Sequence, residues 1–86
     1  MKNLILSFKS RNELYSFARV LKLNGIFSSI ISTPKSIGST CTLSIKTDFK
    51  NLATISKLIR QHQPKSFLGL FSIQQTTNGQ QIFKIM

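Results

Sequence analysis

Two amphipathic helical segments, each set between short apolar runs, constrain the fold of this chain more than any other feature. In both segments the apolar side chains recur at three- and four-residue spacing: Leu14, Phe17, Ala18 and Leu21 in the first, and Phe49, Leu52, Ile55, Leu58 and Ile59 in the second. A helix with one apolar stripe has to bury that stripe against another element. The chain therefore predicts two helices that pack against strands.

The ends of these helices carry recognisable signals. Ser10, followed three residues later by Glu13, has the form of a capping box, in which the glutamate reaches back to the N-cap amide. Gly25 after Asn24 is the natural stop of the first helix. Asp48 is the expected N-cap of the second helix, with Thr47 as the alternative.

Five segments have the composition of strands: residues 4–8, 26–33, 41–46, 67–73 and 80–85. Pro34 closes the second of them, because proline cannot donate a ladder hydrogen bond. Pro64 ends the second helix, and Asn78 with Gly79 predicts a hairpin between the last two strands.

The resulting order is β-α-β-β-α-β-β. It predicts an α+β domain with a ferredoxin-like split βαβ arrangement and one appended C-terminal strand, in which two helices cover one face of an antiparallel sheet. At 86 residues the chain forms one domain, residues 1–86. An exposed strand of the appended hairpin is a candidate edge for pairing two copies into a homodimer, or an ordinary solvated edge.

Positive charge dominates the composition. Twelve lysines and arginines face two acids, Glu13 and Asp48, which gives a formal net charge of +10. Such a field favours an anionic partner, which includes RNA, membrane surfaces and acidic proteins. The alternative is a solvated positive surface, since the cations are spread along the whole chain.

Several classes of function lack their usual signals. One cysteine forms no internal disulfide, which predicts a reducing compartment and, with no signal peptide or apolar span of membrane length, a cytoplasmic protein. The chain has no P-loop, dinucleotide or zinc-protease fingerprint, so no cofactor is predicted. Cys41 and His62 supply at most two ligands for a metal, and His62 is expected to lie at the surface near a helix end.

Cys41 is the strongest chemical candidate, because it stands where a glycine- and serine-containing loop meets a strand. A thiol there is held on a rigid scaffold while it remains accessible, and Lys35 nearby favours the thiolate. Residue chemistry alone leaves the alternative that Cys41 is a small buried hydrophobe at the start of its strand.

The segment 32–45, S-T-P-K-S-I-G-S-T-C-T-L-S-I, together with F-K-S at 8–10 and L-N-G-I at 23–26, resembles a family of small bacterial selenium/sulfur carrier-like domains. The resemblance implies that Cys41 accepts sulfur or selenium as a persulfide or selenosulfide and passes it on, without being an enzyme. The implied partners are a donor enzyme such as a cysteine desulfurase and an acceptor protein. The implied loop around the thiol consists of Thr33, Pro34, Lys35, Gly38, Ser39 and Thr40. Thr42 departs from the family, which usually has glycine there.

Two other classes of function remain open on the sequence. An RNA-binding module would stack bases on strand aromatics, for which Phe8, Phe27, Phe71 and Phe83 are the candidates, and would contact phosphates through scattered cations. Strand aromatics are more often part of a core. A regulatory or assembly domain that dimerises through its sheet is the third class, and it rests on the fold and the exposed hairpin alone.

Overall fold

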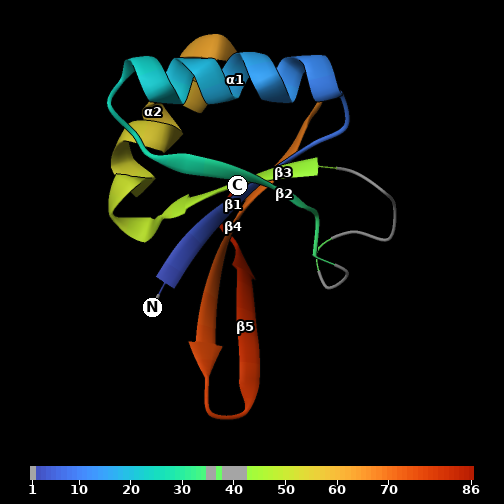
Figure 1. Ribbon diagram of the computed structural model, residues 1–86, viewed down its shortest axis with the longest axis vertical. Helices are drawn as coiled ribbons and strands as arrows, with labels where there is room; N and C mark the ends of the chain where they lie inside the picture. The colour runs from blue at the N-terminus through green and yellow to red at the C-terminus, as the bar shows by residue number, and fades with distance from the viewer. Residues whose placement is uncertain (1, 35–36, 38–42) are drawn as a thin grey trace.

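The computed structural model describes residues 2–34, 37 and 43–86 of the chain. Its elements follow the predicted order, with one short 3-10 turn added before the second helix (Figure 1): β1 Lys2–Phe8, α1 Arg11–Leu23, β2 Ser28–Ser32, β3 Leu43–Asp48, η1 Phe49–Asn51, α2 Leu52–His62, β4 Phe67–Thr76 and β5 Gly79–Lys84. No helix in this part of the chain is long and apolar enough to cross a membrane.

The five strands form one sheet in the order β2-β3-β1-β4-β5, and every neighbouring pair is antiparallel. Strand β1 lies at the centre, between β3 and β4, because each helix returns the chain to the sheet with one strand left between the two that it connects. This topology confirms the ferredoxin-like split βαβ fold with an appended strand. The β4–β5 hairpin extends beyond the layer covered by the helices (Figure 1).

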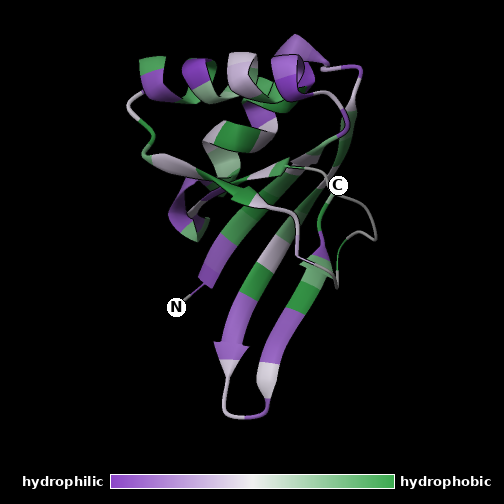
Figure 2. Cartoon of the chain, turned by 45° about the vertical axis from the view of Figure 1, so that its right-hand side comes forward, coloured by the Kyte–Doolittle hydropathy of each residue, from purple (hydrophilic) through white to green (hydrophobic). Residues whose placement is uncertain are grey.

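The core lies between the helices and one face of the sheet. Alternate residues of β1, Leu4, Leu6 and Phe8, belong to the same buried cluster as the predicted helix stripes: Leu14, Phe17 and Leu21 of α1, and Ile55, Leu58 and Ile59 of α2. Burying each such side chain contributes about 1.5–3 kcal/mol. Hydrophobic residues accordingly concentrate where the strands pass beneath the helices, and hydrophilic ones occupy the far end of the hairpin (Figure 2).

The capping box at the start of α1 forms only in its first half. Ser10 Oγ accepts from the backbone N–H of Glu13 at 3.3 Å, as expected. The Glu13 carboxylate, however, accepts hydrogen bonds from the backbone of Lys65 and from both the backbone and the hydroxyl of Ser66. The tertiary fold offers this carboxylate three donors, whereas the N-cap amide offers one.

Other boundaries shift by one to three residues from the predicted ones. Asp48 caps the 3-10 turn, by accepting from the N–H of Lys50 at 2.9 Å, and α2 proper starts at Leu52. Strand β2 starts at Ser28 rather than residue 26, because Ile26 is drawn into the core.

The hairpin turn also shifts. Thr76 pairs with Gly79, so the two loop residues are Thr77 and Asn78. Gly79 takes a φ of +117°, a conformation that favours glycine, and Thr76 Oγ1 donates to its carbonyl at 2.7 Å. The hairpin is therefore confirmed with its turn one residue earlier than predicted.

Candidate functional site

The predicted carrier loop lies only partly within the described chain. Thr33 and Pro34 are described, directly after β2. Cys41, Lys35, Gly38, Ser39 and Thr40, together with Thr42, lie outside the described residues. The expectations for these six residues therefore remain predictions, and the structure contributes the frame from which the loop departs and to which it returns.

That frame is one end of the sheet, where β2 ends and β3 begins. Ser32 pairs with Leu43, and Leu43 pairs on its other side with Phe8, the last residue of β1. The hydroxyls of Thr33 and Ser44 share a hydrogen bond of 2.7 Å, and Ser44 is fully buried. The pairing of Ser32 with Leu43 and the hydrogen bond between Thr33 and Ser44 thus join the two ends of the loop and hold both on the sheet.

A second contact lies just inside the loop. The backbone N–H of Ile37 donates to the carbonyl of Pro34 at 3.0 Å. Pro34 also lines a hollow of about 430 Å³ on the sheet face opposite the helices, together with Ile5, Ile31, Lys46 and Ile73. The loop therefore starts beside a mixed apolar and cationic hollow.

Positive charge gathers at the end of the sheet from which the loop departs. Phe8 leads into Lys9 and the N-terminus of α1, where Arg11 is exposed. Lys9 is tied by its backbone N–H to the carbonyl of Ser66 at 2.8 Å, so it remains next to the strand ends. A helix N-terminus carries a partial positive charge. Anionic groups are therefore favoured at this end of the sheet.

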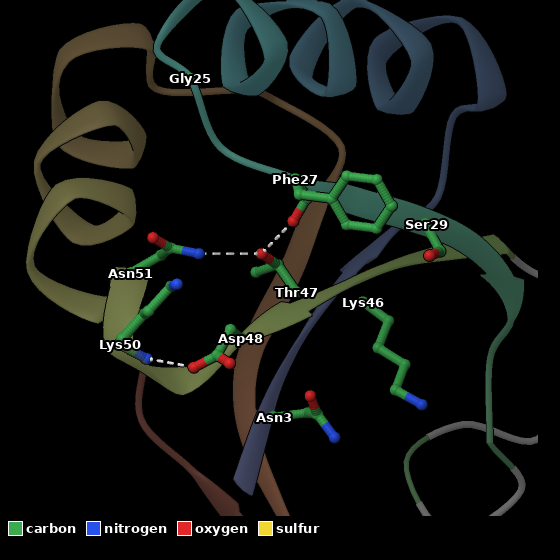
Figure 3. Close-up of a pocket in the computed structure, with 9 residues that line it drawn as sticks. All are labelled: Asn3, Gly25, Phe27, Ser29, Lys46, Thr47, Asp48, Lys50 and Asn51. Carbon is green, nitrogen blue, oxygen red and sulfur yellow. Dashed lines mark hydrogen bonds between the residues drawn. The ribbon is translucent and has the colours of Figure 1, made fainter.

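A polar hollow of about 380 Å³ lies at the other end of β3 (Figure 3). Its described lining comes from the ends of β1, β2 and β3 and from η1: Asn3, Gly25, Phe27, Ser29, Lys46, Thr47, Asp48, Lys50 and Asn51. Phe27 is 88% exposed, the highest value among the large apolar side chains of the described chain.

Hydrogen bonds fix the floor of this polar hollow. Thr47 Oγ1 donates to the carbonyl of Phe27 at 2.7 Å and accepts from Asn51 Nδ2 at 3.1 Å (Figure 3). Asp48 is engaged by the backbone of Lys50. The backbone before β2 is therefore locked to the end of β3, and the Phe27 side chain is carried at the rim of the hollow.

Both acids of the chain are committed to structural hydrogen bonds. Hydrogen bonds from Ser66, with smaller contributions from Lys65, hold the pKa of Glu13 below its ordinary value. Asp48 caps η1. With twelve cations against these two acids, the chain keeps a net charge of +10, which favours anionic partners.

The four aromatics that the sequence predicts on strands lie in different environments. Phe8 is 1% exposed and packs against Phe17 and Phe67, each with ring centroids 5.6 Å away, so it is unavailable for stacking on a base. Phe71 is half-buried, while Phe83 and Phe27 are exposed. The sequence predicts Phe27 within a strand, so it does not distinguish this exposed ring from aromatics of the core. In the structure Phe27 precedes β2.

His62 lies at the end of α2. His62 is exposed in the last turn of α2, as expected, and its ring meets Phe17 edge-on at 6.3 Å. Within residues 2–34, 37 and 43–86, no three histidine, cysteine, aspartate or glutamate residues come together as a metal site.

The split βαβ topology, with two helices on one face of a five-stranded antiparallel sheet, defines a small α+β domain. The chain belongs to the family described as "Putative Se/S carrier protein-like", whose model matches residues 3–66. The match includes the loop and Cys41 and stops just before β4. No curated protein and no solved structure gives a significant match to the chain.

Proposed function

We propose that this protein carries sulfur or selenium on Cys41, between a donor enzyme and an acceptor protein. The observation that carries the proposal is family membership over residues 3–66, a range that contains the chain's one cysteine. A carrier needs one nucleophilic thiol on a stable scaffold and no further catalytic groups. In this reading the protein is not a turnover enzyme.

The chemistry requires no net oxidation. The Cys41 thiolate attacks the outer sulfur of a donor cysteine persulfide, the bond between the two donor sulfurs breaks, and its electron pair leaves on the donor cysteine as thiolate. Delivery repeats the exchange, with an acceptor thiolate attacking the carried sulfur and Cys41 leaving as thiolate. A donor species in which selenium replaces the outer sulfur follows the same course.

The frame of the loop supports this role. Cys41 stands two residues before Leu43, and covalent geometry keeps their Cα atoms within about 7.6 Å of each other. The thiol is therefore tethered to the sheet end that bears Lys9, Arg11 and the N-terminus of α1. Positive charge at that sheet end favours a thiolate and a persulfide anion over their protonated forms.

Thr33, Pro34, Lys35, Gly38, Ser39 and Thr40 complete the proposal as the loop that shapes the approach to the thiol. The bond between Thr33 and Ser44 holds the departing strand against β3, and Lys35 adds a cation close in sequence to Cys41. A cysteine desulfurase is the class of donor, since it presents a persulfide on an enzyme cysteine.

Thiol accessibility tests the proposal against the alternative of a buried core cysteine. The native protein and a synthetic peptide of residues 33–45 are alkylated with iodoacetamide over a range of pH. We expect the folded chain to react at least as fast as the peptide, and the increase of its rate with pH to have its midpoint at a lower pH than that of the peptide. A native rate about a hundredfold below that of the peptide, restored by guanidinium, would show that Cys41 is buried and would refute the carrier role.

A further inference from the structure

We propose that the polar hollow beside Phe27 binds a nucleotide, with the base stacked on the Phe27 ring and the phosphate held by Lys46 and Lys50. The occupant with this chemistry is a segment of single-stranded nucleic acid. The proposal is independent of the carrier role of Cys41.

The exposed ring is the first observation. Phe27 is 88% exposed, and its main chain is fixed by the hydrogen bond that Thr47 Oγ1 donates to its carbonyl. A large apolar ring exposed to water on a fixed main chain offers a stacking platform, and base stacking on such rings is tolerant of sequence because every base has a π-face.

The charges beside the ring are the second observation. Lys46, near the end of β3, and Lys50, in η1, line the same hollow as Phe27 (Figure 3). Asp48 lies between them, but its carboxylate already accepts the N–H of Lys50. Two lysines and one aspartate give the lining a net charge of +1, and the whole chain has a net charge of +10. Both favour an anionic ligand.

The remaining lining favours a nucleotide over an acidic peptide. Among the described residues that line the hollow, Phe27 supplies the only large apolar side chain, whereas Asn3, Ser29 and Asn51 supply amide and hydroxyl groups. A protein anchor is usually an aliphatic or aromatic side chain seated in an apolar pocket. One aromatic ring surrounded by cations and amides matches the needs of a base and its phosphate.

This site shares Lys46 with the hollow beside Pro34, whereas Phe27 and Lys50 do not line that hollow. Lys46 stands three residues along β3 from Leu43, which is about 10 Å at the rise of a strand. Cys41→Ser is therefore expected to bind nucleic acid like the wild type, and loss of nucleotide binding is expected to leave thiol chemistry intact. The two proposals can fail independently.

The test is fluorescence anisotropy with a labelled uridine oligomer of about ten nucleotides, a length within the usual site size, titrated with the full chain at several salt concentrations. We expect Phe27→Ala to weaken binding by about 5- to 100-fold with the salt dependence unchanged. Lys46→Gln and Lys50→Gln should each lower the slope of log affinity against log salt by about 0.7. Phe83→Ala and Lys57→Gln are the matched controls, and circular dichroism checks that every variant folds.

Further arms distinguish the source of the nucleotide. Competition by uridine monophosphate that depends on Phe27 would support a free nucleotide as the occupant, while binding of the oligomer alone would support a single strand. Oligoglutamate of equal charge that competes fully, with Phe27→Ala binding like the wild type, would reduce the surface to a general polyanion or acidic-peptide site and overturn the proposal. Failure of the oligomer to bind at low salt would overturn it as well.

Discussion

The Glu13 carboxylate in the first turn of α1 accepts hydrogen bonds from both the backbone N–H and the hydroxyl of Ser66, which is 53 residues further along the chain. The N–H of Lys65 adds a third bond at 3.1 Å. These bonds join the start of α1 to the connection between α2 and β4. One of only two acids in the chain therefore links two parts of the fold next to the loop-bearing end of the sheet.

This link predicts a specific dependence of stability on pH. The folded pKa of Glu13 is lowered from its ordinary value of 4.5, mainly by the Ser66 hydroxyl. The contribution of Glu13 to the free energy of unfolding is therefore complete above the unfolded pKa and is lost as the pH falls through the folded pKa. Thermal unfolding followed by circular dichroism between about pH 6 and pH 3 measures it.

The Glu13→Gln variant separates this residue from general acid effects. We expect it to melt at a lower temperature than the wild type near neutral pH and to lose less stability on acidification. Asp48→Asn, which changes the same charge at the cap of η1, is the matched control. Equal acid sensitivity of Glu13→Gln and wild type would contradict the assigned role of Glu13.

The hydroxyl pair of Thr33 and Ser44 predicts a second effect. Thr33→Val keeps the shape of the side chain but removes its hydrogen bond to the fully buried Ser44 hydroxyl, so we expect a loss of about 1–2 kcal/mol in the free energy of unfolding. Urea denaturation measures this loss. In a double-mutant cycle with Ser44→Ala, the two losses should overlap, whereas simple addition would mean that the hydroxyls do not interact.

Gly69 predicts a third effect, which depends on the ring that lies over it. A Cβ at this position would approach two Phe71 ring atoms at 2.9 Å and 3.0 Å and the carbonyl oxygen of Met86 at 3.3 Å. Gly69→Ala should therefore destabilise the protein by about 1–3 kcal/mol. Because the closest atoms belong to the ring, Gly69→Ala combined with Phe71→Leu should cost less than the sum of the two single changes. Strict additivity in denaturation would argue against the contact.

Much of the fold was predictable from local patterns. The stripes that include Leu14 and Ile55 are buried as their spacing indicates, and Gly25 ends α1 with a φ of +74°. The second bond of the predicted capping box was not predictable, because the donors to Glu13 come from residues 65–66 and only tertiary packing brings them near. The split βαβ order followed from the sequence of elements, since short connections leave few topologies.

The candidate sites were predictable to different degrees. Cys41 is named by residue type and family resemblance, and its role stays a prediction because it lies outside the described residues. The polar hollow was not found, because Phe27, Lys46 and Lys50 come together only when β2 pairs with β3 and η1 follows it. Exposure of Phe27 is a property of the folded chain that its strand-like neighbourhood in the sequence concealed.

The central claim, that Cys41 carries a chalcogen, is tested most directly by the intact mass of the protein after incubation with a cysteine desulfurase and free cysteine. We expect the wild type to gain the mass of one sulfur atom, to lose it on treatment with a reducing thiol, and to gain it again on a second incubation. Lys57→Gln, at an exposed position of α2, is the control, and it should load like the wild type. Equal labelling of Cys41→Ser, or no added mass on the wild type, would contradict the account.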